Sequence, residues 1–281
     1  MKRYFLFDAL IEADKTTPFT QATQTLFRML ELHVPSLKEA KSDVGFEMMM
    51  LDQEKFYIRN AFTLSKAAKE NAHIVCPEQS SFSSLAITKE ALQTNPELYE
   101  KVASALLDKS VTLNLDVEIL SLERFLLEVC DSEKLKTMLK HPFTKFQAAL
   151  FQSNAYCRAR KFNRDEDLNT LLELIELKRV KHEHRFESDG YELFDANPQA
   201  AQKLCGKAML DMFDNAADFI VVTDARSFVM CDAYQKESEK LLGREIGLFS
   251  LTLPELLVLA LGETNAKAIG VDKHNVRVTL L

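Results

Sequence analysis

Ser42-Asp43-Val44-Gly45-Phe46-Glu47 and Glu187-Ser188-Asp189-Gly190-Tyr191-Glu192 are two versions of one short segment, and their agreement decides how the chain is organised. Their glycines lie 145 positions apart (190 − 45). The surroundings agree in order: a short apolar strand comes before each segment, an amphipathic helix follows it, and then a second buried strand. The sequence therefore predicts an internal duplication, with a first unit over residues 1–140 and a second over residues 141–281.

Six short apolar runs predict the strands of these units. The first run shows no polar alternation, which is typical of a strand at the centre of a parallel sheet. Helical stretches long enough for crossover connections separate the runs, and this favours parallel βαβ units. We expect an α/β fold of two tandem Rossmann-like domains, each a small parallel sheet flanked by helices. The expected strands are 3–7, 73–76, 117–120, 146–151, 219–222 and 246–249.

The first helix is expected to begin at Thr17-Pro18. Threonine is a common N-cap residue, and proline suits the first helical position because its missing N–H has no partner there. Apolar residues then recur at helical spacing through residues 19–30.

Composition and charge exclude several classes of protein. The chain has 281 residues, of which 47% are hydrophobic and 27% charged, as in ordinary globular proteins. Its formal charge of −7 argues against a nucleic-acid partner. Asp8 interrupts the N-terminal apolar run too early for a signal peptide, and Leu256–Leu261 is too short to span a bilayer. The five cysteines are dispersed singly, as is typical of reduced thiols. We expect a cytoplasmic protein without a membrane span.

Polar residues follow the predicted strands at matching positions in the two units. In Rossmann-like sheets, ligands bind where the strands end. The intervals agree: 43 − 8 and 188 − 153 are both 35, and 81 − 78 and 228 − 225 are both 3. One spacing rule therefore describes both candidate sites. These positions are Asp8, Asp43, Val44, Glu78 and Ser81 in the first unit, and Ser153, Ser188, Asp189, Ala225 and Phe228 in the second.

This spacing resembles the duplicated cysteine-rich CCG domain, Cys-x(n)-Cys-Cys-Gly-x(n)-Cys-x-x-Cys, of the heterodisulfide reductase B family. The resemblance runs from Tyr4 to about Val276. It includes the turn glycines Gly45 and Gly190, and Pro77 after the second predicted strand. It implies two Rossmann-like domains and, in the family, iron–sulfur chemistry beside an iron–sulfur partner subunit.

The departure from the family is complete at the chemical positions, because none of the ten strand-end residues is a cysteine. Iron–sulfur clusters are held by thiolates, so we expect no cluster and no other cofactor. The resemblance then suggests a degenerate, non-catalytic relative that acts through protein–protein contact, with an iron–sulfur subunit as one candidate partner. The sequence leaves the oligomeric state open.

Two other functions remain open at this point. Asp8, Asp43 and Glu78 are carboxylates, which are the ligands that Mg²⁺ and Mn²⁺ prefer, so they could form a metal site of an enzyme or metal binder. We favour the other interpretation, a disused site that has drifted to small and polar residues, because the second unit has no such trio and spacing alone does not prove that the three carboxylates converge. The second alternative is a small-molecule binder that uses the vacated cluster cavity.

Overall fold

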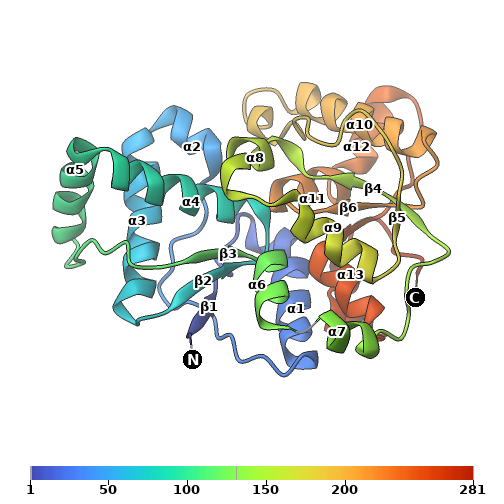
Figure 1. The fold of residues 1–281 in the computed structure, drawn as a ribbon. Helices are drawn as coiled ribbons and strands as arrows, with labels where there is room; N and C mark the ends of the chain where they lie inside the picture. Colours follow the sequence, from blue (N-terminus) through green and yellow to red (C-terminus); the bar gives the residue numbers. More distant parts are fainter. Residues whose placement is uncertain (1, 131, 281) are drawn as a thin grey trace.

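The structure, a computed structural model, describes residues 2–130 and 132–280 and confirms the α/β class (Figure 1). Two small sheets contain parallel pairs throughout and are flanked by helices. The first sheet has the order β1-β2-β3 and the second β5-β4-β6-β7. The strands are β1 (Tyr4–Leu6), β2 (His73–Cys76), β3 (Ile119–Ser121), β4 (Gln147–Phe151), β5 (Lys178–Arg179), β6 (Phe219–Val222) and β7 (Ser250–Thr252).

Helices connect the strands in both units. Those of the first unit are α1 (Ala13–Met29), α2 (Gly45–Leu51), α3 (Gln53–Lys69), α4 (Gln79–Thr94), α5 (Pro96–Leu107), α6 (Leu122–Val129) and α7 (Ser132–Met138). Those of the second unit are α8 (Ser153–Arg158), α9 (Asp165–Leu174), α10 (Pro198–Asp214), α11 (Ala225–Asp232), α12 (Gln235–Leu242), α13 (Leu253–Ala260) and α14 (Ala266–Ile269). Short 3₁₀ turns are η1 (Arg160–Phe162), η2 (Tyr191–Leu193) and η3 (Val271–Lys273).

The first helix does not begin where the sequence predicts. Helix α1 starts at Ala13, so that Pro18 lies inside it. The Thr17 hydroxyl donates hydrogen bonds to the carbonyls of Ala13 (2.9 Å) and Asp14 (3.4 Å). The Asp14 carbonyl is the group that an N–H at position 18 would bind in a helix. The threonine side chain therefore compensates for the proline instead of capping the helix.

The last strand of each sheet in chain order, β3 in the first and β7 in the second, lies further along the chain than predicted. Both strands end at the residue that caps the following helix: Ser121 accepts from the Arg124 N–H, and Thr252 forms a capping box with Glu255. In the second unit, the amides of Ile246 and Gly247 bond the Glu239 carboxylate instead of a strand. The polar residue that caps a helix can thus also be the last residue of a strand. The pattern of apolar residues does not show this.

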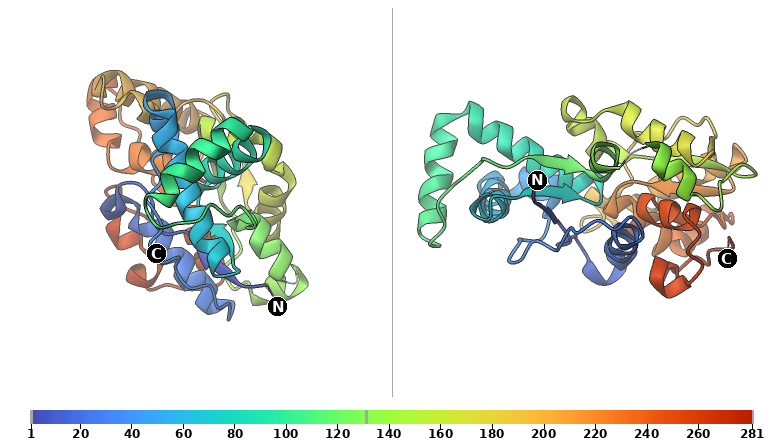
Figure 2. Two further views of the ribbon diagram at one scale, coloured as in Figure 1. Left: turned by 90° about the vertical axis from the view of Figure 1, so that its left-hand side faces the viewer. Right: turned by 60° about the horizontal axis from the view of Figure 1, so that its bottom comes forward.

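The two units contact each other through helix pairs of corresponding position. Helix α1 follows the first strand of its unit and packs against α13, which follows the last strand of the other unit. Likewise α9, from the segment after β4, packs against α6, which follows β3. Helices α4 and α11 follow the central strands β2 and β6 and meet each other. Figures 1 and 2 show the units side by side, with α5 at the free end of the first. This arrangement has pseudo-twofold character, whereas the duplication itself stays a prediction.

The hydrophobic core is shared between the units. One cluster of buried side chains contains Phe5 and Ile74 from the first sheet together with Ile220 from the second. A second cluster contains Leu6 with Leu150 and other residues of the second unit. A third cluster, with Phe56 and Leu106, belongs almost wholly to the first unit. The boundary at residue 140 stays a prediction. Within residues 2–130 and 132–280, no helix combines the length and the apolar character needed to cross a membrane.

The turn glycine of the second unit provides a test of this geometry. Gly190 has φ +83°, and a Cβ there would lie 2.5 Å from the backbone oxygen of Ala201 in α10. Gly243 also has positive φ, at +66°, but its Cβ would meet no atom within 4 Å. Gly243→Ala should cost about 1–2 kcal/mol of unfolding free energy from backbone strain alone. Gly190→Ala should cost clearly more, because α10 must also move. Urea denaturation measures both, and equal losses would contradict this geometry.

Candidate functional site

The central helices α4 and α11 bring the candidate residues of the two units together. Glu78 is the N-cap of α4, where its carboxylate accepts hydrogen bonds from the N–H groups of Ser80 (2.8 Å) and Ser81 (2.6 Å) and from the Ser81 hydroxyl. The same carboxylate accepts from the Ala225 N–H, at 3.1 Å, in the first turn of α11. Glu78 and Ala225, predicted as equivalent positions of separate units, are therefore in direct contact.

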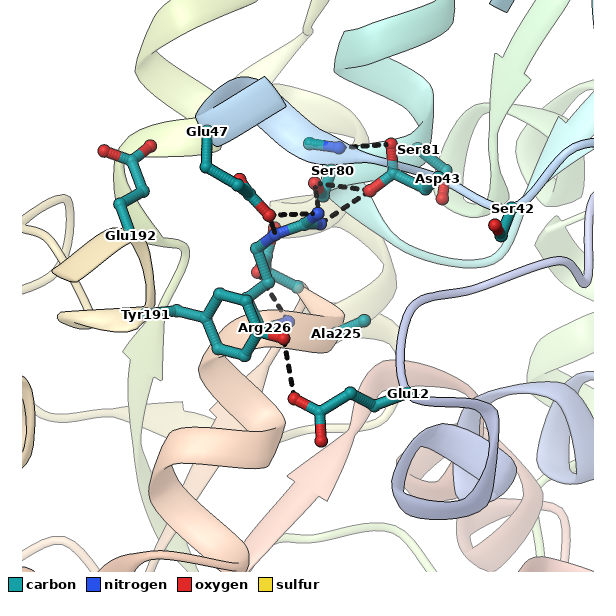
Figure 3. Close-up of polar contacts among 12 residues, drawn as sticks. Glu12, Ser42, Asp43, Glu47, Ser80, Ser81, Tyr191, Glu192, Ala225 and Arg226 are labelled. Atoms are coloured by element: carbon teal, nitrogen blue, oxygen red, sulfur yellow. Dashed lines mark hydrogen bonds and ion pairs between the residues drawn. The ribbon is translucent and has the colours of Figure 1, made fainter. Parts of the chain in front are cut away.

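Arg226, the residue after Ala225, reaches from the second unit into the first (Figure 3). Its Nη1 donates to Asp43 Oδ2 at 2.6 Å and to Ser80 Oγ at 2.7 Å. Its Nε and Nη2 donate to Glu47 Oε1 at 2.9 and 2.7 Å. The side chains of Arg226 and Asp43 are buried. A guanidinium of one unit thus lies between two carboxylates of the other, and we call these contacts of Arg226 with Asp43, Glu47 and Ser80 the Arg226 network.

Charge governs the protonation of this network. Burial disfavours ionisation of Asp43, but the Arg226 guanidinium outweighs burial and lowers the pKa of that carboxyl. Burial and the nearby Asp43 raise the pKa of Glu78. These opposite directions are typical of carboxylates that compete for one cation. Asp43 is therefore the ionised partner of Arg226.

Asp224 adds a further buried carboxyl beside the network. It is the N-cap of α11, where Oδ1 accepts from the N–H groups of Arg226 (2.9 Å) and Ser227 (3.2 Å). Its Oδ2 is buried without a hydrogen-bond partner among the described residues. Burial, together with the Glu78 and Asp189 carboxyls, raises the pKa of Asp224 well above its ordinary range. The site therefore holds more carboxyl groups than cations.

The second unit uses its strand-end positions to close turns. Asp189 accepts from the Ser227 hydroxyl at 2.7 Å and from the Tyr191 N–H at 2.9 Å. The Ser188 hydroxyl accepts from the Gly190 N–H at 3.1 Å. Ser153 has a positive φ of 54°, and its hydroxyl accepts from the Ala155 N–H at 3.3 Å. These side chains satisfy backbone donors.

The last predicted position of the second unit, Phe228, belongs to the core. Its ring packs edge-on against Phe19 (5.9 Å between centroids) and against His274 (5.0 Å). Ala225, one turn earlier on α11, is also buried in this cluster. The rings of Phe19 in α1 and His274 in the C-terminal segment thus pack against Phe228, at a position where the resemblance predicts a cysteine.

The carboxylate trio of the first unit receives no support as a metal site. Among the described residues, no group of three His, Cys, Asp or Glu side chains could hold a metal ion. Asp43 faces the Arg226 cation, and the oxygens of Glu78 accept from backbone N–H groups. Asp8 is half-buried, and Val44, also half-buried, is the N-cap of α2 and offers no ligand atom. A guanidinium occupies the place beside Asp43 where a cation would bind.

The thiols do not fit an iron–sulfur cluster either. A cluster requires several thiolates around one volume. Cys76 is buried inside β2, and burial raises the pKa of its thiol well above the ordinary value. Cys205 and Cys231 are buried on α10 and α11 with their sulfurs 3.8 Å apart. Cys130 is half-buried and Cys157 is exposed. None of the five occupies a strand-end position, so the residues present do not suit the family's cluster.

The structure adds functional candidates that the spacing rule does not contain. Arg226 and Glu47 form the network itself. Tyr191 lies beneath the Arg226 guanidinium, 5.5 Å from it, and donates its hydroxyl to Glu12 at 2.6 Å. The one signal in the sequence was the aspartate of Asp224-Ala225-Arg226, which predicts a helix N-cap. Nothing in that pattern shows that the arginine reaches the other unit.

A comparison with models of known protein families finds a match within the second unit. Residues 191–275 match the family model of the HdrB-like C-terminal domain. This stretch is similar to the HdrB-like C-terminal domain. It contains α11 with Arg226 and the cap residue Asp224, together with the positions Ala225 and Phe228. The resemblance to the heterodisulfide reductase B family, predicted from the spacing, is therefore confirmed, while the loss of cluster binding stays a prediction.

The whole chain also matches a solved structure. A crystal structure of a hypothetical protein from Helicobacter pylori superposes with a TM-score of 0.85 at 21% sequence identity. The match covers 100% of this chain and 53% of that one, so this chain spans about half the length of that protein. This likeness concerns the fold alone. We found no match among curated proteins.

The Arg226 network should dominate the response to mutation at this site. Arg226→Met leaves the buried Asp43 and the half-buried Glu47 without a counter-charge, and the uncompensated Asp43 should cost about 3–5 kcal/mol of unfolding free energy. Adding Asp43→Asn to that variant should recover part of the loss, because one uncompensated charge is removed. The matched control is Arg244→Met, which breaks the exposed pair with Asp214 and should cost less than about 1 kcal/mol. Chemical denaturation of the wild type and the three variants measures these free energies. A double variant that is no more stable than Arg226→Met would argue against the network.

His274 predicts a pH dependence. Its Nε2 lies 2.7 Å from Glu255 Oε1, and both side chains are fully buried. Burial opposes the charge on His274, but Glu255 and then Asp232 outweigh it and raise its pKa. A raised folded-state pKa stabilises the protein fully below the unfolded value of about 6.5, and this stabilisation is lost as pH rises through the folded pKa. The stability difference between wild type and His274→Gln should therefore shrink from pH 6 towards pH 9.

Thermal or urea unfolding across this pH range gives the measurement. His141→Gln is the control, because His141 is exposed and should leave the pH dependence unchanged. A difference between wild type and His274→Gln that grows with pH would show that His274 is neutral in the folded protein.

Proposed function

We propose that this protein is a non-catalytic relative of the heterodisulfide reductase B family that works through contact with a protein partner. The observation that carries the proposal is the Arg226 network, because Asp43, at a position where the family's pattern has a cysteine, is a carboxylate bonded to a guanidinium. Such groups supply no electron carrier. We therefore expect the protein to act through its surface, by contact with another protein.

Helix α2 connects the Arg226 network to that surface. It begins at Gly45, directly after Val44, and Glu47 on its inner side bonds Arg226. At its other end, Met50 and Leu51 have 73% and 83% of their side chains exposed, more than any other large hydrophobic residue that the structure describes. Exposed apolar side chains that gather in one place mark interaction sites, and methionine adapts readily to a partner.

The start of α2 contacts the second unit. Phe46, one turn before Met50, packs under the Arg158 guanidinium at 4.9 Å. Arg158 in turn pairs with Glu192 at 3.0 Å, and the next residue, Leu193, is 46% exposed. We call Met50, Leu51, Arg158, Glu192 and Leu193 the α2 surface. An apolar centre with a charged border is the usual composition of a protein interface.

Metal and sulfide analysis tests the loss of cluster chemistry. Protein purified without oxygen should contain less than about 0.1 iron and 0.1 acid-labile sulfide per chain and should show no visible absorption, because the strand-end positions offer no thiolate. Several iron atoms per chain, retained after gel filtration, would overturn the non-catalytic assignment whatever the partner.

The α2 surface can be tested separately from the cluster. Met50→Ser with Leu51→Ser should weaken a stoichiometric complex at least about tenfold, since exposed apolar anchors carry much of the binding energy. The matched control is Leu107→Ser, which removes a leucine that is 62% exposed at the far end of α5. Native mass spectrometry of the protein isolated from its source cells identifies the partner, and titration with that purified partner measures affinity. Equal affinities for both variants would remove the α2 surface from the proposal.

A further inference from the structure

A cavity of about 490 Å³ lies beside the start of β1, in the region of the N-terminus in Figure 1, and is lined by residues that play no part in the Arg226 network. It lies between the start of β1, the segment 35–39 and the last turn of α3. Its volume is within the usual range for small-molecule sites. A second hollow of about 270 Å³ shares two of its lining residues, Lys66 and Lys69. The lysines therefore stand between two concave regions.

The cavity is positively charged although the chain carries −7. Its lining includes Arg3, Lys38, Lys66 and Lys69 against two carboxylates, Glu39 and Glu70. Lys66 pairs with Glu39, and Arg3 pairs with Glu70 at 3.5 Å. The side chains of Lys38 and Lys69 have no hydrogen bond or ion pair among the described residues. Two uncompensated ammonium groups therefore remain.

The lysines favour the ionised form of Glu39. Lys66, hydrogen-bonded to it, lowers the pKa of that carboxyl, and Lys69 and Lys41 lower it further. Lysines in the last turn of a helix also complement the helix dipole. That role accounts for Lys66 and Lys69 on α3, but not for Lys38 or Arg3, which come from other segments. Convergence of cations from three segments is typical of an anion site.

The cavity also offers a backbone donor and an apolar floor. Segment 35–37 extends the first sheet, since the Leu6 N–H bonds the Pro35 carbonyl and the Leu37 N–H bonds the Leu6 carbonyl, both at 2.9 Å. The intervening Ser36 therefore turns its N–H away from β1, and that N–H has no partner among the described residues. Phe5 and Leu37 are buried beneath. An anionic group and an apolar body can thus be bound together.

We propose that this cavity binds a small molecule that carries a phosphate monoester on an apolar or aromatic body. A phosphate monoester has a charge near −2 at neutral pH, which matches the two unpaired lysines, whereas a single carboxylate would leave one uncompensated. The phosphate would lie among Lys38, Lys69 and the Ser36 N–H, and the body would cover Phe5 and Leu37. This site is remote from the α2 surface and does not depend on the proposed partner.

Phenyl phosphate is the probe, and NMR or calorimetric titration of the full chain is the measurement. Phenyl phosphate should bind more tightly than inorganic phosphate, because the ring adds contact with the apolar floor. Lys38→Ala with Lys69→Ala should weaken binding at least about tenfold. The control, Lys236→Ala with Lys240→Ala, removes the same charge from exposed positions of α12 and should change affinity less than about twofold.

Three results would overturn the proposed phosphate site. Absence of binding at about 10 mM phenyl phosphate would overturn the proposal. Equal weakening in the two double variants would also overturn it, because a general effect of net charge would then explain the affinity. Tighter binding of inorganic phosphate than of phenyl phosphate would reject the apolar body and with it the proposed ligand class. All four lysines are exposed, so the variants should keep the wild-type unfolding midpoint, which is checked by urea denaturation.

Discussion

The pairing of Arg226 with Asp43 and Glu47 is the interaction on which the relation between the two units depends. It joins α11 of the second unit to the turn before α2 and to α2 itself. A buried guanidinium cannot shed its proton, so it must keep its counter-charges wherever it lies. The network therefore stabilises one relative position of the units more than apolar packing alone would, because apolar faces tolerate small shifts and paired charges do not.

The residues at the two strand-end regions have different surroundings in the two units. In the first unit, Asp43 and Glu78 remain charged or strongly polar, and Arg226 and backbone N–H groups satisfy them. In the second, Phe228 joins the core beside Phe19 and His274. An asymmetry of this kind follows from the topology, because α4 and α11 meet near the pseudo-twofold axis. The Arg226 guanidinium comes from the second unit and bonds Asp43 and Ser80 of the first, so the two regions differ.

The first and central predicted strands of each unit could be found from the sequence, but the last strands could not be placed accurately. Residues 74–76 and Phe219–Val222 are apolar and buried, and the structure has β2 and β6 within the predicted bounds. The last strands, β3 and β7, were misplaced because Ser121 and Thr252 serve as strand residues and helix caps at once. The start of α1 was missed because Thr17 compensates for Pro18 through two carbonyl bonds. Local patterns predict an element well when one physical constraint determines it, and poorly when two compete.

The main contact of the candidate site could not be predicted from the sequence. The spacing rule contains Asp43, Glu78 and Ala225, which the structure brings together near the starts of α4 and α11. It gave no weight to Arg226, because an arginine beside an expected position has no meaning until its partner is known. That partner lies 183 residues earlier in the chain, as the Arg226–Asp43 bond shows. Contacts of such sequence separation are set by the packing of α4 on α11, and the charge of one unit can be interpreted only with the other in place.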